Sequence, residues 1–282
     1  MTMNSMFYKA SSFNQPLTTW NTGKVINMGY MFGYAYAFNN DVPFNTSSVT
    51  FLSNMFVGAS SFDHYSIASW DVSKVINFQY MFKDTMSFNI YLANWNTAAS
   101  TNIQYMFHNS SFNQDILSWN VLQVQDMSNM FHDNTIFNQN LADWNMLNKL
   151  SLNSMFYVAI SFNQDLCQWG CILYGETTIK NMFYDTACPY TANPIFTRML
   201  YGPFCYDCSS YTGYPTLKLT LHPKMKPTKS LKPTIHPMPF PMHQPTVKPT
   251  LPPCLPSSIY PRAVWVAPTL PDFAHAVLGT IT

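Results

Sequence analysis

Few residues of this chain have the types and spacing that catalysis requires. The sequence contains no glycine-rich phosphate loop, no H-E-x-x-H pair and no nucleophile elbow around a serine. Its seven histidines are scattered, at His64, His108, His132, His222, His236, His243 and His275. This pattern predicts a protein that is not an enzyme and that has no cofactor, no catalytic residue and no metal site.

Two carboxylates offer one route to an enzymatic interpretation. Asp115 and Asp165 each end a Phe-Asn-Gln-Asp tetrapeptide. If the two copies stand in stacked coils, two coils apart at ~4.8 Å per coil, the carboxylates are about 10 Å apart. A separation of that order suits an inverting pair in glycoside hydrolysis. A carbohydrate-active β-solenoid enzyme is therefore a distant third hypothesis.

Five of the six cysteines cluster late in the chain, and they have three interpretations. Clustered cysteines in an extracellular protein indicate disulfides, here across a C-terminal cap. The alternative is a zinc site that joins the Cys205-x-x-Cys208 pair to two cysteines further back, and the third option is neither. In the disulfide case the odd cysteine pairs with Cys254 or with another chain. The five residues of the predicted cap are Cys167, Cys171, Cys188, Cys205 and Cys208.

The elements that position these residues come from an internal repeat. A Met-Phe pair recurs at steps of 24 to 27 residues, and a second phenylalanine, an Asn or Asp and then an aromatic residue follow in phase. Periods of this length are typical of solenoids. The pairs begin at Met6, Met31, Met55, Met81, Met106, Met130, Met155 and Met182.

One repeat contains two kinds of spacing. Leu17-x-x-Trp20-x-Thr22 has the spacing of the L-x-x-L-x-L strand of leucine-rich repeats, and Val25, Met28, Met31, Phe32 and Ala35 follow at steps of three and four. We therefore predict an α/β repeat solenoid, leucine-rich-repeat-like, with about seven coils of 24–26 residues. Each coil would hold a short strand plus a short helix or 3₁₀ segment.

The repeat also defines the predicted domains. Residues 1–185 form the solenoid, which starts inside a unit and so has a truncated N-terminus. Residues 186–213 form the cysteine-rich C-terminal cap. Residues 214–282 form a disordered tail rich in Pro, Thr and Lys, because 12 of the 42 residues from 215 to 256 are proline.

Three columns of the repeat have a structural interpretation beside a functional one. The tryptophans are expected to be core rather than a stacking platform for sugars. The Asn column is expected to be an internal ladder that satisfies backbone groups of adjacent coils rather than a ligand contact. The methionines are expected to fill gaps in the core.

The exposed positions of the predicted strand form the candidate ligand face. They are small, polar and mostly uncharged, which suits weak, multivalent contact with a protein or glycan surface, although a merely soluble face would look the same. Two sequons, at Asn45 and Asn109, fit N-glycosylation of a secreted eukaryotic protein. The predicted face consists of Thr18, Thr19, Asn21, Asn45, Ser69, Asp71, Asn94, Asn96, Ser118, Asn120, Asp143 and Asn145.

Composition and charge exclude several classes of protein. Only 10% of the residues are charged. Residues 1–211 carry a net charge of −5 and residues 212–282 a net charge of +6, so the repeat region has no electrostatic footprint for nucleic acid. No run of 18 apolar residues predicts a membrane span, and the first residues do not form a signal peptide.

The repeat resembles a known family. Segments such as Asn129–Asn145, Phe112–Asp115 and Phe162–Leu166 resemble the BspA-like leucine-rich-repeat surface proteins, in their mycoplasma-type repeat subclass, over residues 1 to about 185. The resemblance implies an extracellular or cell-surface protein without catalytic residues, and adhesion in some members. Our first hypothesis is thus a non-enzymatic surface or secreted protein for adhesion or recognition of a protein or glycan. The alternative is an intracellular protein–protein interaction scaffold or effector.

Overall fold

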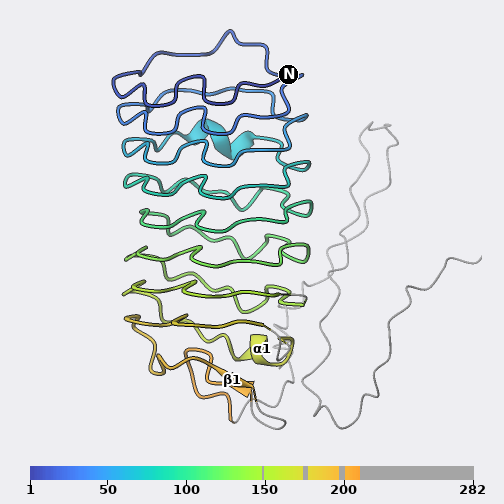
Figure 1. Ribbon diagram of the computed structural model, residues 1–282, viewed down its shortest axis with the longest axis vertical. Helices are drawn as coiled ribbons and strands as arrows, with labels where there is room; N and C mark the ends of the chain where they lie inside the picture. Colours follow the sequence, from blue (N-terminus) through green and yellow to red (C-terminus); the bar gives the residue numbers. More distant parts are fainter. Residues whose placement is uncertain (148, 174–176, 197–200, 210–282) are drawn as a thin grey trace, which may run out of the picture.

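The chain forms a stack of coils, one coil for each repeat (Figure 1). The structure is a computed structural model that describes residues 1–147, 149–173, 177–196 and 201–209. The predicted tail, residues 214–282, lies outside the described residues. Successive coils are joined by parallel β-bridges, which pair Thr2 with Asn27, Asn27 with Phe51, Phe51 with Asn77, Asn77 with Asn102, Asn102 with Asp126, Asp126 with Ser151, and Ser151 with Thr178.

The strand predicted over residues 17–22 is wrong. Residues 17–20 make a β-turn instead, in which the Trp20 amide donates to the Leu17 carbonyl at 3.3 Å. The turn recurs in other coils, where the Trp95 amide donates to the Leu92 carbonyl at 3.0 Å. Leucine and tryptophan three positions apart would lie on opposite faces of a strand. A turn lets both side chains point into the core.

The predicted helix over residues 25–35 is also wrong. This segment is a chain of β-turns, and only alternate amides bond within it: Met31 to Met28, Gly33 to Tyr30 and Ala35 to Phe32. The amides between them donate to the next coil, at 2.7 to 3.1 Å, in the pairs Met28 to Phe51, Tyr30 to Ser53, Phe32 to Met55 and Tyr34 to Val57. A helix would use every amide within the segment and would leave none to hold the neighbouring coil.

The turns require left-handed backbone at two residues of each coil, four positions apart. In the second coil these residues are Tyr30, with a φ of 55°, and Tyr34, with a φ of 59°. Left-handed residues other than glycine are strained, so they persist only where the surroundings fix them. The bonds between coils provide that constraint. In the described ranges the helices are η1 (Tyr65–Ser69) and α1 (Cys167–Gly170).

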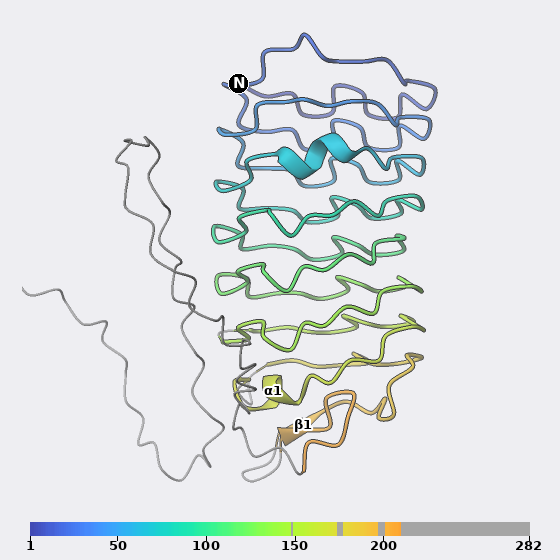
Figure 2. The same ribbon diagram turned by 180° about the vertical axis from the view of Figure 1, so that it is seen from behind.

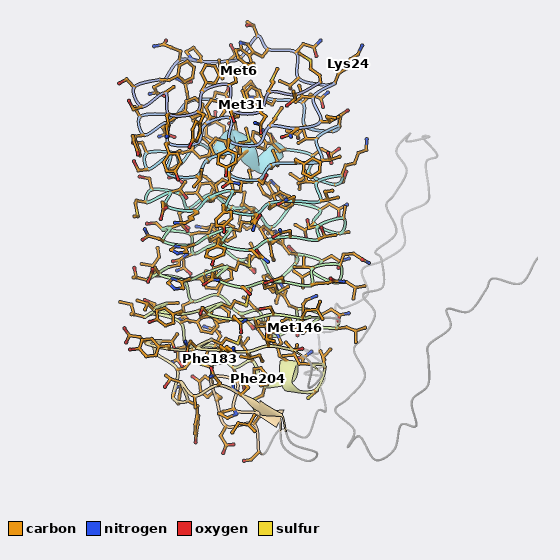
Figure 3. All side chains as sticks on the ribbon, viewed as in Figure 1. Met6, Lys24, Met31, Met146, Phe183 and Phe204 are labelled. Carbon is orange, nitrogen blue, oxygen red and sulfur yellow. A yellow bond between two sulfur atoms is a disulfide. The ribbon has the colours of Figure 1, made fainter. Side chains whose placement is uncertain are left out.

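The interior is an aromatic ladder, as the repeat predicts. Within one coil the two phenylalanine rings stack at 3.8 to 4.1 Å, for example Phe107 on Phe112 at 3.9 Å. From coil to coil the first ring stacks on its equivalent at 5.5 to 5.9 Å, for example Phe107 on Phe131 at 5.8 Å. The methionines of the pairs from Met31 to Met182 pack in the same core, whereas Met6 of the first pair is exposed. Figure 3 shows side chains filling the stack from Met31 to Phe183.

The Asn column forms the predicted ladder of hydrogen bonds between coils, but the ladder is not internal, because its side chains are exposed or half-buried. The Oδ1 atom of each Asn or Asp accepts the backbone amide of its equivalent in the next coil, at 2.8 to 3.0 Å. The ladder runs from Asn14 to Asn163, where the Tyr206 hydroxyl donates to the last Oδ1 at 2.9 Å. These side chains therefore replace part of the strand pairing that the coils lack.

The far end of the stack carries a small disulfide-linked cap (Figures 1 and 2). Its antiparallel strands are β1 (Ile195–Phe196) and β2 (Tyr201–Gly202), with Ile195 opposite Gly202. Phe204 is fully buried against the core, and it lies near Phe183 at the lower end of Figure 3. None of the helices in the described ranges is long and apolar enough to cross a membrane.

Candidate functional site

The predicted ligand face lies on the Trp turns rather than on strands. We call these twelve residues the Trp-turn face. Eleven of them are exposed and Asn145 is half-buried. The Trp-turn face is therefore accessible to solvent, as predicted. The backbone that carries it is a turn, whereas the prediction placed it on a strand.

Half of the Trp-turn face has a structural task. The side-chain oxygens of Asn21, Asn45, Asp71, Asn96, Asn120 and Asn145 accept the backbone amide two residues later, at 3.0 to 3.4 Å. Such Asx turns fix the chain as it leaves the tryptophan. The bonds from Ser73 hold the pKa of Asp71 below its ordinary value. One oxygen of each of these side chains is thus engaged in closing a turn.

The serines of the Trp-turn face are engaged as well. The Ser69 hydroxyl donates to the Ser66 carbonyl at 2.9 Å, and the Ser118 hydroxyl donates to the Ala93 carbonyl at 2.7 Å. Four exposed members remain for which the described residues show no hydrogen bond, namely Thr18, Thr19, Asn94 and Asp143.

The two sequon asparagines differ in their surroundings. Asn45 is exposed. Asn109 is half-buried, and its amide nitrogen, the atom that a glycan would modify, donates to Asp84 Oδ1 at 2.9 Å. Of the two, Asn45 has the more accessible side chain.

The two aspartates of the enzymatic hypothesis do not share a cleft in the described residues. Asp115 accepts the Leu117 amide at 2.8 Å and Asp165 accepts the Cys167 amide at 2.9 Å, so both close local turns. An open hollow of about 270 Å³ contains Asp165 but not Asp115. It is lined by Asn140, Ala142, Gln164, Asp165 and Gln168.

The cysteines form disulfides rather than a thiolate site. Cys167 of the last tryptophan-bearing coil bonds to Cys208, and Cys188 bonds to Cys205. Cys171 is disulfide-bonded as well. The zinc alternative is therefore wrong, because Cys205 and Cys208 belong to two different disulfides. The Cys167–Cys208 bond ties the cap to the coil stack.

A row of aromatic side chains along the outside of the stack was not predicted. We call it the Tyr-His stripe. His108 and His132, which lie far apart in sequence, stack at 4.7 Å between ring centroids. Tyr80 on Tyr105, His132 on Tyr157 and Tyr157 on Tyr184 show the same 4.7 Å spacing. The stripe consists of Tyr80, Tyr105, His108, His132, Tyr157 and Tyr184.

A signal for the stripe exists in the sequence. The residue after each Met-Phe pair forms one column, and in its second half this column reads His108, His132, Tyr157 and Tyr184. The seven histidines look scattered along the chain. When each is assigned to its position within the repeat, His108 and His132 occupy the same position in adjacent coils.

A second group of tyrosines lies toward the N-terminus, where Tyr8 and Tyr30 occupy the columns of the stripe and Tyr34 and Tyr36 occupy neighbouring columns. Tyr8 meets Tyr30 and Tyr34 edge to face, at 5.7 and 5.8 Å, and Tyr34 meets Tyr36 at 6.4 Å. Gly58 makes room for this group, because a Cβ there would lie 2.6 Å from the Tyr34 ring. Burial and the neighbouring tyrosines and Asp84 raise the pKa of Tyr34.

The middle of the stripe holds a cluster of ionisable groups. His132 Nδ1 lies 3.0 Å from Asp133 Oδ2, and Lys83 Nζ lies 2.6 Å from Asp84 Oδ2. Burial, together with the charge of Lys83 and the neighbouring His132 ring, lowers the pKa of His108 to about 4. The His108 imidazole is therefore neutral at physiological pH and keeps a lone pair on one ring nitrogen.

Comparison with known proteins gives a family and no function. No curated protein matches the chain, and no solved structure matches it. One protein family matches, in three overlapping segments that cover residues 1–43, 42–111 and 92–192. These segments include every coil of the stack and the start of the cap. The chain belongs to this family, which is described as Mycoplasma protein of unknown function, DUF285.

Proposed function

We propose that this chain is a non-enzymatic recognition protein that works outside the cytosol, secreted or displayed on a surface, and that its coils are a divergent form of the leucine-rich repeat. The observation that carries the proposal is the Cys167–Cys208 disulfide between the coil stack and the cap. Disulfides of this structural kind form and persist in oxidising compartments and are rare in reducing ones.

The Tyr-His stripe is the binding surface of this proposal. Its Tyr184 is 54% exposed, and in the N-terminal tyrosine group Tyr8 is 40% and Tyr36 50% exposed. Tyrosine supplies apolar area and a hydroxyl at a low entropic cost, and it is enriched in protein interfaces. The coils hold the row in place through bonds between their backbones, so little order is lost on binding.

A protein ligand fits the stripe better than a glycan does. Sugars pack on the open faces of aromatic rings, but in the stripe each ring covers the face of its neighbour at 4.7 Å. What remains accessible is a line of ring edges and hydroxyl groups. Such a line suits the mixed apolar and hydrogen-bonding contacts of a polypeptide surface.

The experiment tests the oxidised full-length chain against immobilised collagen, fibronectin, laminin and mucin, and against a glycan array. A stripe variant, Tyr105→Ser with Tyr184→Ser, is compared with a Trp-turn variant, Thr19→Ala with Asn94→Ala. We expect one of the protein probes to bind, with a loss of at least ~10-fold in the stripe variant, as for interface hot spots, and no loss in the Trp-turn variant.

Three outcomes contradict the proposal. Binding to glycans that survives the stripe variant would point to a sugar ligand. Loss of binding in the Trp-turn variant alone would move the ligand to that face. Failure of all the probes to bind the oxidised chain would remove the support for an adhesive role.

A further inference from the structure

We propose that His108, His132 and Asp133 bind a zinc ion on the outside of two adjacent coils. One ring nitrogen of each histidine and one carboxylate oxygen of the aspartate lie within 4.8 Å of one another. Two nitrogens and one carboxylate oxygen are a donor set that Zn²⁺ prefers. The inference goes beyond the proposed recognition function and does not depend on it.

The backbone fixes the three donors relative to one another. The Asn109 amide donates to the His132 carbonyl at 2.8 Å, so the two histidines keep the register of their coils. The Asp133 amide donates to the Tyr157 carbonyl at 2.8 Å, and Asp133 has a left-handed φ of 58°. This arrangement turns its carboxylate back toward the ring of the preceding residue, with Oδ2 at 3.0 Å from His132 Nδ1.

The histidine nitrogens lack other partners. The Nδ1 atoms of His108 and His132 are both buried. That of His108 has no hydrogen-bond partner among the described residues, and that of His132 faces the Asp133 carboxylate, with Oδ2 at 3.0 Å. Buried polar atoms without a partner are uncommon and call for a specific explanation. A metal ion bound between the two coils would satisfy both atoms at once.

Charges of both signs surround the cluster. Lys83 opposes a cation at His108, but its ammonium group is paired with Asp84 at 2.6 Å, and both Asp84 and Asp133 favour a cation there. The side-chain amide of Asn109 donates from Nδ2 to the other oxygen of Asp84 at 2.9 Å, which holds this pair in place. Asp133 faces the His132 ring instead of Lys83, with Oδ2 at 3.0 Å from Nδ1, so both groups can turn their donor atoms to one ion.

Zinc binding requires a small rearrangement of side chains. In a tetrahedral site with bonds of about 2.0 to 2.1 Å, neighbouring donor atoms are about 3.4 Å apart. In the structure the three donor atoms lie within 4.8 Å of one another, so they must move closer together. The two imidazoles stack with an angle of 17° between their planes, so they must tilt apart before both lone pairs meet one ion. Both rings are half-buried and stack on Tyr105 and Tyr157 at either side, so this tilt would shift the neighbouring rings as well.

The test is a Zn²⁺ titration of the oxidised, EDTA-treated full chain by calorimetry, repeated with Co²⁺ as a spectroscopic probe. The two test variants are His132→Gln and Asp133→Asn. The matched controls are His64→Gln, outside the cluster, and Asp185→Asn, which has the equivalent left-handed position two coils further on. Asn tolerates left-handed backbone, so Asp133→Asn keeps the fold even if His132→Gln does not.

We expect one site per chain and an affinity at least ~10-fold lower in each test variant, with both controls unchanged. The Co²⁺ spectrum should show tetrahedral nitrogen and oxygen ligation. The proposal is overturned if the chain binds no Zn²⁺, if the test variants bind as the controls do, or if a thiolate charge-transfer band shows that cysteines hold the metal. None of these readouts requires a protein ligand, so the result is independent of the binding assays.

Discussion

The indole nitrogen of Trp95 donates a hydrogen bond to the Ile67 carbonyl oxygen in the preceding coil, at 3.0 Å. The same contact links Trp70 to Val42, Trp119 to Leu92, Trp144 to Ile116 and Trp169 to Leu141, at 2.9 to 3.1 Å. Each of these tryptophans therefore fills the core and also adds a second hydrogen bond to a carbonyl that already accepts a backbone amide, as the Ile67 carbonyl accepts the Trp70 amide at 3.1 Å. This double use explains why tryptophan, rather than phenylalanine, dominates the column.

Replacing one of these tryptophans by phenylalanine separates the two uses. Trp95→Phe keeps most of the apolar volume but removes the indole bond to the Ile67 carbonyl, which still accepts the Trp70 amide at 3.1 Å. We expect a loss of about 0.5–1.5 kcal/mol in the free energy of unfolding, measured by urea denaturation. The control is Trp20→Phe, in the first coil, where the residue is half-buried and its indole nitrogen makes no such bond in the described residues. An equal loss at both positions would show that volume alone matters.

The Asn ladder makes a similar prediction. Asn113 Oδ1 accepts the Asn138 amide and the Gln139 side chain, both at 2.9 Å. Asn113→Ala removes both bonds, so we expect it to cost about 1–3 kcal/mol in thermal or urea unfolding. Asn94→Ala, at an exposed position, should cost less than about 0.5 kcal/mol. If the two substitutions cost the same, the ladder does not hold the coils together.

Lys149 gives the stack a dependence on pH. It is buried in a column that valine fills in most other coils, and its Nζ donates to the Val121 carbonyl at 2.7 Å. Burial lowers the pKa of Lys149 to about 8. Between pH 8 and the ordinary value near 10.5 the unfolded chain binds more protons than the folded chain, so stability rises with pH across this window.

The measurement compares urea unfolding at pH 7.5 and pH 9.5, below the range in which the tyrosines ionise. We expect the native chain to gain about 2 kcal/mol from Lys149 over this interval. Lys149→Met should lose that gain. Parallel curves for the two proteins would mean that the lysine keeps its ordinary pKa in the folded state.

The cap should contribute to stability through its disulfide. The Cys167–Cys208 bond closes a loop with a sequence separation of 41 residues. In the chain-entropy description such a loop is worth about 4 kcal/mol. Cys167→Ala with Cys208→Ala should lower the free energy of unfolding by about this amount, read from urea denaturation without reductant. A double variant as stable as the native chain would contradict a role for the bond in holding the cap.

The periodicity and core of this fold were predictable from sequence because identical environments recur in every coil. A buried position such as that of Phe107 is bounded by the same neighbours above and below, so only similar side chains fit it. The local backbone was not predictable in the same way. Val25, Met28, Met31 and Phe32 have helical spacing, but the chain turns through left-handed residues such as Tyr30, and tyrosine carries no signal for that conformation.

The candidate site was hidden for a different reason. The stripe column holds Lys83, then His108 and His132, then Tyr157, so no single residue type marks it. The side chains on the outside need only to stack with one another, and several planar types can do so. By contrast, the position after each tryptophan holds Asn or Asp in successive coils, for example Asn96 and Asn120. The residue type repeats there because its side-chain oxygen closes the same turn in each coil.

The most direct test of the central claim is disulfide mapping of the protein taken from its native source, by alkylation of free thiols before and after reduction. A recognition protein that works outside the cytosol should yield the Cys167–Cys208 and Cys188–Cys205 peptides as oxidised pairs. Recovery of these four cysteines as free thiols would contradict the account. It would favour instead an intracellular scaffold that binds its partners through the same coils.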